Sequence, residues 1–358
     1  MNDVYERLRE RLDKFPQGFP ETESRVEITI LKQLFTPDEA ELALSIKPLP
    51  EPVAAIADRA GKDPALTERM LYDMSKKGVI FRLKLGDVLY YNMIPWMIGI
   101  WEFQLNRLDQ DNIRLYEQFY EEGLVPYRKD LKHTGIRVIP IEDEVITHKE
   151  VQSYEKVSEI LNSNDRFAVA DCICRKERSM MGKGCGKLME SCLVFGLGVD
   201  YFVENGLARE ISREEAQQIL RKAEEEGLIH MSSNHAGQKG VICNCCGCCC
   251  KALAYTNRHG IRNAMGKSNY CAELSEATCT ICGACIERCQ VYAIKEQNGR
   301  VVIDMEKCIG CGLCSSSCPA GSLSLRVRKT GDLPHIFRDS FEAVNALGSE
   351  KNKVFPFD

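Results

Sequence analysis

The chain has 358 residues, 44% of them hydrophobic, and a formal net charge of −5. This length and apolar content support about two to three folded domains and exclude a chain that is disordered throughout. The mildly acidic balance gives no overall attraction to nucleic acid or anionic lipid, and the charged start of the sequence lacks the pattern of a secretory signal. We therefore expect a cytoplasmic, multidomain protein of the α+β class.

The first predicted domain covers residues 1–100. A capping box at Thr36 and Glu39 starts one helix, and the cap Asp63 starts another that ends at Gly78. β-Branched and aromatic residues then flank the turn at Gly86, as in a hairpin. Helices followed by a hairpin resemble the winged helix-turn-helix domains of bacterial regulators. This resemblance implies a winged-helix-like domain that contacts DNA through its last helix and its wing.

The charges on this predicted helix do not favour DNA. Arg69, Lys76 and Lys77 are balanced by Glu68 and Asp73, whereas DNA-binding helices present a basic face to the phosphates. The sequence therefore favours packing or a protein partner for this domain, and DNA binding stays open as an alternative.

An apolar segment from Tyr90 to Phe103 follows the hairpin. It contains Pro95 and is too short to span a bilayer, so no transmembrane segment is expected. We interpret it as core or as a partner-facing surface, with Tyr90 to Trp101 as a candidate patch for a redox partner. Residues 101–165 are predicted as a mainly helical connector, with an extended segment at 135–146 and a helix at 150–164.

Residues 166–269 form a predicted cysteine-rich α/β domain. All 19 cysteines of the chain lie after residue 171, and six of them fall within 243–250. In an extended strand, residues i and i+2 point to the same face, so Cys172 with Cys174 and Cys243 with Cys245 would form two same-side pairs. Two such pairs brought together make a four-sulfur metal site.

The three adjacent cysteines at 248–250 cannot all face one metal from a regular element. Subsets of the following residues are therefore candidates for a further iron–sulfur cluster, or two: Cys172, Cys174, Cys192, Cys243, Cys245, Cys246, Cys248, Cys249 and Cys250. Alternatives are redox disulfides, or a zinc site to which His230, His235 or His259 contributes. Arg175 could donate hydrogen bonds to cluster sulfur, and Cys185 has no assigned role. The region resembles uncharacterised 4Fe–4S dicluster proteins of anaerobes.

The strongest motif lies at the C-terminal end. The pattern C-x₂-C-x₂-C-x₃-C occurs twice, as Cys279, Cys282, Cys285 and Cys289, and as Cys308, Cys311, Cys314 and Cys318. Between the two sets, Asn298-Gly299 separates two strand-like runs, which predicts a hairpin. Gly283, Gly310 and Gly312 would let the backbone approach a cluster closely.

These motifs resemble the bacterial two-cluster ferredoxin domain, over residues 270–328. The resemblance implies crossed ligation of two [4Fe–4S] clusters, one by Cys279, Cys282, Cys285 and Cys318, the other by Cys308, Cys311, Cys314 and Cys289. One departure is Gln290, which stands where the pattern has a proline. Two zinc sites are the alternative for these cysteines. Residues 329–358 are a C-terminal tail.

The function predicted from the sequence is iron–sulfur electron transfer. Two ferredoxin-type clusters would pass single electrons to or from a cysteine-ligated site in the middle domain, as a protein or subunit that works with a redox partner. One alternative is an iron–sulfur oxidoreductase with catalysis at the middle-domain cluster. Another is a redox-responsive DNA-binding regulator. Whether the chain is an enzyme stays open, and an anaerobic host is expected.

Overall fold

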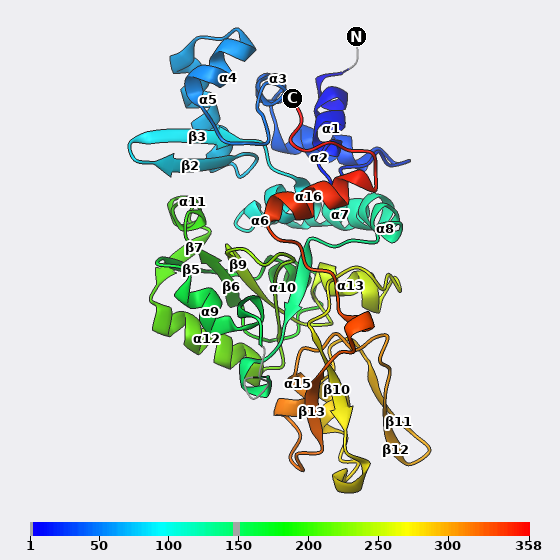
Figure 1. Cartoon of the computed structure of the whole chain (residues 1–358). Helices are drawn as coiled ribbons and strands as arrows, with labels where there is room; N and C mark the ends of the chain where they lie inside the picture. Colours follow the sequence, from blue (N-terminus) through cyan, green and yellow to red (C-terminus); the bar gives the residue numbers. More distant parts are fainter. Residues whose placement is uncertain (1–2, 146–150) are drawn as a thin grey trace.

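The structure is a computed structural model that describes residues 3–145 and 151–358. It is elongated, with an N-terminal unit at one end, a six-stranded sheet in the middle and a C-terminal module at the other end (Figure 1). Helices and several separate sheets alternate along the chain, so the predicted mixed α+β class is confirmed. Within the described residues, no helix is both long enough and apolar enough to cross a membrane.

The N-terminal unit contains five helices and a small sheet in the order β1-β3-β2. The capping box is present, because the Thr36 hydroxyl accepts from the Glu39 N–H at 3.3 Å and the Glu39 carboxylate accepts from the Thr36 N–H at 2.8 Å. The assignment as a winged-helix domain stays a prediction. The elements are α1 Val4–Asp13, α2 Val26–Leu34, α3 Pro37–Ala43, β1 Glu51–Pro52, α4 Val53–Ala60, α5 Pro64–Lys76, β2 Phe81–Leu85 and β3 Val88–Asn92.

Three basic residues at the end of α5 and in the hairpin make contacts within the chain. Lys77 lies 2.6 Å from the Glu39 carboxylate, and the buried Arg82 lies 2.6 Å from the Glu204 carboxylate. Lys76 donates to the backbone carbonyl of Glu204, the last residue of helix α11 Gly198–Glu204. The contacts of Lys76 and Arg82 hold the N-terminal unit against the middle of the molecule and favour a packing role for α5.

The apolar segment after the hairpin is core. Trp96 packs against Phe19, Tyr116 and Phe119, with ring centroids 5.7, 5.1 and 5.8 Å away. Burial limits its interpretation as a partner-facing patch, because Tyr91, Trp96 and Trp101 are each at most 2% exposed. Contact with a redox partner stays a prediction. The elements that follow are α6 Trp101–Phe103, α7 Gln110–Phe119 and α8 Val125–Lys129.

The middle sheet is antiparallel throughout, in the order β4-β8-β9-β6-β5-β7. Its strands are β4 Ile136–Ile139, β5 Phe167–Asp171, β6 Glu190–Phe195, β7 Ala208–Ile211, β8 Ile229–Ser233 and β9 Val241–Cys245. Strand β4 comes from the segment predicted as a connector. The predicted extended segment and helix around it run into residues 146 and 150, which lie outside the described residues.

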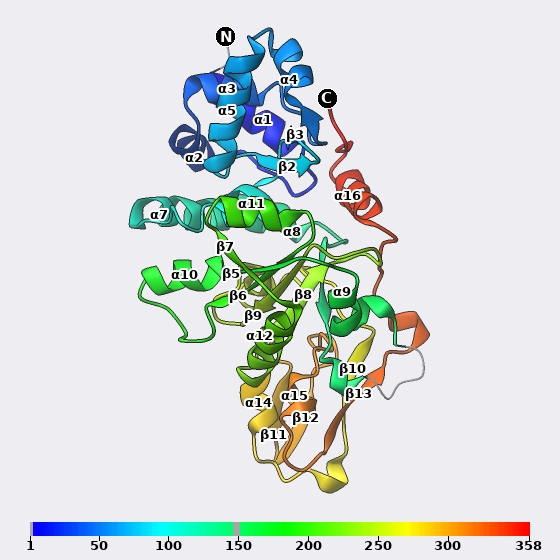
Figure 2. The ribbon, with the colours of Figure 1, turned by 90° about the vertical axis from the view of Figure 1, so that its left-hand side faces the viewer.

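The two faces of this sheet have different neighbours. Helices α9 Val157–Asn162 and α12 Arg213–Glu225 pack on the face that carries Leu193 and Ile242 (Figure 2). Because side chains alternate along a strand, the adjacent residues Cys192 and Cys243 point to the opposite face. That face looks toward α10 Ile173–Met180, α13 Lys251–Asn257 and the N-terminal half of the chain.

The C-terminal module contains two small sheets and two short helices. The predicted hairpin is confirmed, since strands β11 Ile294–Gln297 and β12 Arg300–Ile303 pair around Asn298 and Gly299, which have φ values of 54° and 71°. Strands β10 Tyr270–Leu274 and β13 Leu323–Val327 pair beside it. The helices are α14 Ala284–Arg288 and α15 Leu313–Ser316.

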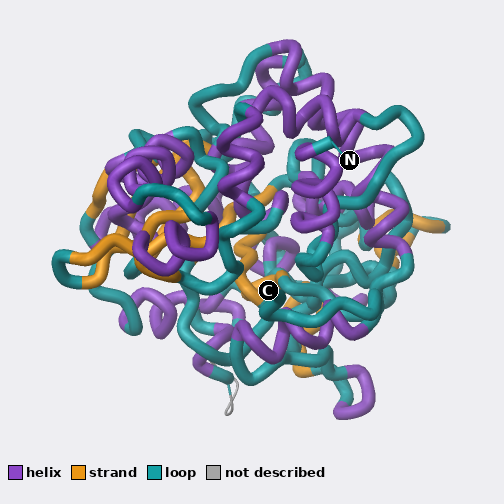
Figure 3. The backbone as a smooth tube through the Cα atoms, turned by 90° about the horizontal axis from the view of Figure 1, so that it is seen from above, coloured by secondary structure: helices purple, strands orange, loops and turns teal. Residues whose placement is uncertain are grey.

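The C-terminal tail is folded. It forms α16 Ser340–Ser349 and then returns to the N-terminal unit, where Phe357 packs edge-on against Phe15 with ring centroids 5.0 Å apart. Arg11 donates to the backbone carbonyl of Asp358 at 2.7 Å. Both chain ends therefore lie on the same face of the molecule (Figure 3).

Candidate metal centres

The eight motif cysteines of the C-terminal module line two small cavities. Each cavity receives three cysteines from one motif and the last cysteine of the other motif. We call them the Cys279 set, which comprises Cys279, Cys282, Cys285 and Cys318, and the Cys308 set, which comprises Cys289, Cys308, Cys311 and Cys314. These groups contain the same residues that the crossed ligation pattern pairs.

Backbone N–H groups donate to the crossing cysteines in a repeated manner. The Ala293 N–H donates to the Cys289 sulfur at 3.2 Å, and the Ser322 N–H donates to the Cys318 sulfur at the same distance. Such hydrogen bonds stabilise a thiolate and raise the reduction potential of a cluster that it ligates. Although burial raises the pKa of Cys318, backbone N–H groups led by that of Ser322 hold it below the ordinary value.

Gly310 shows why this module needs glycine. It has a φ of +71°, and a Cβ there would lie 2.1 Å from the Tyr270 carbonyl oxygen and 2.3 Å from the Ser268 hydroxyl. Ser268 donates to the Gly310 carbonyl at 2.7 Å. The loop that carries the Cys308 set is thereby held directly against the start of β10.

A second group of thiols lies in the middle of the molecule. A cavity of about 410 Å³ is lined by six cysteines, and we call it the six-thiol cavity. Its cysteines are Cys172, Cys174, Cys192, Cys243, Cys245 and Cys250. Four separate segments meet here: the end of β5 with the start of α10, strand β6, strand β9, and the residue that precedes α13.

The sequence predicted part of this arrangement. Cys243 and Cys245 do lie on one strand, β9, and Cys192 is the register partner of Cys243 on β6. The prediction that Cys172 and Cys174 share a strand is wrong. Strand β5 ends at Asp171, Cys172 caps α10, and Cys174 lies in its first turn.

The six sulfurs form a continuous series of contacts. The pKa of Cys243 lies well below that of an ordinary thiol, because its sulfur accepts hydrogen bonds from Cys192 and Cys245. The pKa of Cys250 is lowered in the same way by Cys174 and Cys245. The same hydrogen bonds, together with burial, raise the pKa values of Cys174, Cys192 and Cys245, so thiolate character is concentrated on part of the set. Six thiols around one cavity supply the sulfur donors that an iron–sulfur centre requires.

Charged residues lie beside these thiols. The Lys251 ammonium lies 3.0 Å from the Glu177 carboxylate and 5.2 Å from the centre of the Trp101 ring. Burial raises the pKa of Glu102 to about 8, although its carboxylate accepts from the Gly99 N–H at 2.7 Å. Beyond the thiols, the same cavity is lined by apolar residues such as Met97 and Leu347.

A third, smaller group holds four more cysteines. The sulfurs of Cys185, Cys246, Cys248 and Cys249 all lie within 4.8 Å of one another, and we call this group the compact site. Cys185 and Cys246 are 4.0 Å apart, and Cys248 and Cys249 are 3.7 Å apart. Sulfurs bound tetrahedrally at about 2.3 Å to one zinc ion lie roughly 3.8 Å from each other. In a cubane each thiolate binds a different iron, which separates the sulfurs further.

The cysteine-rich stretch is therefore shared between two sites. Strand β9 directs Cys243 and Cys245 into the six-thiol cavity, and the turn after it places Cys246, Cys248 and Cys249 in the compact site. The next residue, Cys250, again lines the six-thiol cavity. Sequence reasoning missed Cys185, which the chain delivers from about 60 residues earlier. Among the described residues, the compact site consists of cysteines alone, so the alternative of a zinc site with His230, His235 or His259 as a ligand is not found there.

Arg175 lies between the two thiol groups. It is 2% exposed and donates to the Asn244 carbonyl at 2.9 Å and to the Cys246 sulfur at 3.8 Å. It also donates to the Ser191 hydroxyl. Its sulfur contact is to a cysteine side chain, so the prediction that Arg175 donates to cluster sulfide or to an anionic ligand stays a prediction.

Comparison with known proteins supports the iron–sulfur reading. A family model described as a 4Fe-4S binding domain matches residues 301–324. The chain carries a 4Fe–4S binding domain near its C-terminus. That match covers all four cysteines of the second motif and no residue of the middle region.

Two archaeal relatives are also similar. The chain is 36% identical over 83 residues to an uncharacterized ferredoxin of Methanocaldococcus jannaschii, MJ0265, and 31% identical over 91 residues to a second one, MJ0155. These alignments cover 23% and 25% of this chain and 48% and 55% of the relatives, so the chain spans about half the length of the curated relatives it matches. No solved structure matches.

Proposed function

We propose that this chain is an iron–sulfur electron-transfer protein with two ferredoxin-type [4Fe–4S] clusters and a third iron–sulfur centre in the six-thiol cavity. The Cys279 set and the Cys308 set would each hold one cluster. The observation that carries the proposal is the gathering of all eight motif cysteines into two cavities with exchanged fourth ligands. Iron–sulfur clusters exchange single electrons, so each centre acts as a relay.

The packing of the chain supports electron flow between the centres. Cys245 and Cys250 of the six-thiol cavity belong to the same buried core as Cys308 and Cys314 of the C-terminal module. Electrons that enter at one end of this core would reach the other end without crossing solvent. A redox partner protein would contact the C-terminal module, because Cys282 there is exposed.

The compact site has a different proposed role. Its sulfur spacing fits one tetrahedral metal ion, and we assign it to structural zinc. Zinc has no redox chemistry, so it would fix the cysteine-rich turn without carrying electrons. Arg175 would neutralise part of the negative charge of four thiolates through its contact with Cys246.

One observation favours catalysis as a second candidate function. The six-thiol cavity extends past its sulfurs to Met97, Ile98 and Tyr255, and Ile98 is 54% exposed. A small molecule that entered this way would reach the centre directly. Cyanide, a strong ligand for an open iron position, distinguishes the two candidates. A relay leaves the spectrum of the middle centre unchanged, and a catalytic centre shows a perturbation of that centre alone.

Electron paramagnetic resonance during a redox titration tests the proposed function. We expect the anaerobically purified protein to show a third centre beside the two ferredoxin-type signals, and Cys245→Ser to remove the third centre only. Cys271→Ser is the matched control, because Cys271 is buried in β10 and lies outside the Cys279 set, the Cys308 set, the six-thiol cavity and the compact site. Identical spectra for wild type and Cys245→Ser would contradict the proposal.

A further inference from the structure

A large cavity lies between the middle sheet and the C-terminal module. Its volume is about 610 Å³, within the range of roughly 300–1,000 Å³ that is usual for small-molecule sites. Six cationic side chains line it, against only two carboxylates, in a chain whose net charge is −5. The cations are Lys132, Arg262, Lys267, Arg326, Arg328 and Lys329, and the carboxylates are Glu306 and Asp332.

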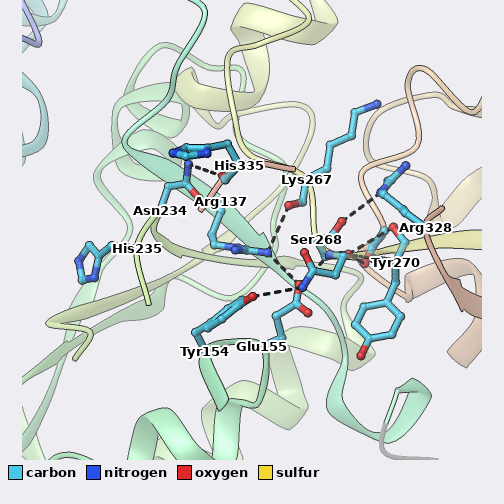
Figure 4. Close-up of polar contacts among 12 residues, drawn as sticks. Arg137, Tyr154, Glu155, Asn234, His235, Lys267, Ser268, Tyr270, Arg328 and His335 are labelled. Atoms are coloured by element: carbon cyan, nitrogen blue, oxygen red, sulfur yellow. Dashed lines mark hydrogen bonds and ion pairs between the residues drawn. The ribbon is translucent and has the colours of Figure 1, made fainter. Parts of the chain in front are cut away.

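Part of this positive charge is held in place by the backbone. Arg328 is buried and donates to the Ser268 carbonyl at 3.0 Å and to the Cys308 carbonyl at 2.8 Å. Lys267 donates to the Glu306 carbonyl at 2.5 Å. In Figure 4 the side chains of Lys267 and Arg328 extend to the same side from neighbouring segments. Cations that are positioned before a ligand arrives lose little side-chain entropy on binding.

The cavity also offers unused hydrogen-bonding capacity. Asn234 is 3% exposed, and its amide nitrogen donates to the carbonyls of Thr134 and His335 at 3.0 and 3.3 Å. Its side-chain oxygen is buried, with no hydrogen-bond partner among the described residues. A buried oxygen of this kind costs stability unless a donor reaches it. The exposed Lys329 has no ion pair within the described residues.

We propose that this cavity binds a phosphate-bearing small molecule. The wall has six cationic and two carboxylate side chains, and one cation, Arg326, is already paired with Glu273 outside the cavity at 3.4 Å. The remaining excess of about three positive charges exceeds what one carboxylate would balance. A phosphoryl group carries about −1.5 to −2 charges and accepts several hydrogen bonds from arginine and lysine. The proposal does not depend on electron transfer.

Calorimetric titration of the full-length holoprotein with pyrophosphate in low-salt buffer tests this. We expect binding that weakens at least tenfold in Arg326→Gln/Lys329→Gln and is unchanged in Lys295→Gln, which removes an exposed charge on β11 outside the cavity. Citrate, which has three carboxylates, should bind at least tenfold more weakly than pyrophosphate. Absence of pyrophosphate binding, equal binding by the double variant, or equally tight citrate binding would each overturn the proposal.

Discussion

The Gly247 N–H donates a 2.8 Å hydrogen bond to the side-chain oxygen of Gln290. Gly247 lies at the centre of the cysteine-rich turn, and Gln290 follows Cys289, at the position where the two-cluster ferredoxin pattern has a proline. Asn257 reinforces the contact by donating to the Gln290 carbonyl at 2.9 Å. Proline has no side-chain acceptor, so the departure from the pattern has a physical reason: Gln290 ties the compact site to the C-terminal module.

This contact leaves no room for a side chain at Gly247. A Cβ there would lie 2.3 Å from the Gln290 carbonyl oxygen, whereas a Cβ at Gly240 would meet nothing within 4 Å. We expect Gly247→Ala to destabilise the protein by roughly 1–3 kcal/mol because the turn must move away, and to release the compact-site metal at a lower temperature. Anaerobic thermal unfolding with a zinc indicator measures both effects. Gly240→Ala is the control. Equal unfolding and metal-release temperatures for the two variants would contradict the close contact between Gly247 and Gln290.

The exchanged ligands predict which cluster a given cysteine serves. Cys318 belongs to the second motif but lies with Cys279, Cys282 and Cys285. Cys318→Ser should therefore perturb the cluster of the first motif and leave the Cys308 set intact. Iron analysis and electron paramagnetic resonance of the reduced protein check this, with Cys271→Ser as the unaffected reference. Loss of the other cluster would show that ligation is not crossed.

A buried ion pair of the middle region contacts the start of the C-terminal module. Arg137 and Glu155, 0% and 1% exposed, lie 2.8 Å apart, and Glu155 also accepts from the Asn269 N–H at 2.7 Å (Figure 4). Removing one partner leaves an unpaired buried charge, so we expect Glu155→Ala to cost about 3–5 kcal/mol of unfolding free energy. Arg114→Ala, which breaks an exposed ion pair with Asp111, should cost at most about 1 kcal/mol. Denaturant titration measures the unfolding free energy of both variants. Similar losses of unfolding free energy would contradict the role of the buried pair.

Lys239 predicts a pH dependence of stability. Burial lowers its pKa to about 7, with a smaller contribution from Arg137, while an unfolded lysine titrates near 10.4. Between these values the unfolded chain binds more protons, so the Lys239 contribution to stability should rise with pH from about 7 to about 10 and stay level below that window. Lys239→Met has no titratable group at this position, so it should lack this pH-dependent contribution to stability. The difference in melting temperature between the two proteins should change across this window, and a constant difference would contradict the shifted pKa.

Local signals in the sequence predicted local structure well. The Asn298-Gly299 hairpin and the capping box at Thr36 depend on neighbouring residues only, and both are present. The alternation of β9 also directed Cys243 and Cys245 to one side as expected.

Long-range relations were not accessible in the same way. Cys172 and Cys174 continue an apolar strand in sequence, but the chain turns into α10 at that point. The pairing of Cys185 with Cys246 depends on how the loop before β6 folds back, which no spacing rule encodes. The division of the cysteine-rich stretch between two sites likewise follows from the turn between β9 and α13, which the tertiary structure determines.

The most direct test of the account is the content of iron, acid-labile sulfide and zinc per chain in anaerobically purified protein. Two ferredoxin-type clusters, a third cubane in the six-thiol cavity and zinc in the compact site predict about twelve irons, about twelve sulfides and about one zinc. A content of about eight irons and eight sulfides would contradict the central claim, because the six thiols of the middle cavity would then hold no iron–sulfur centre.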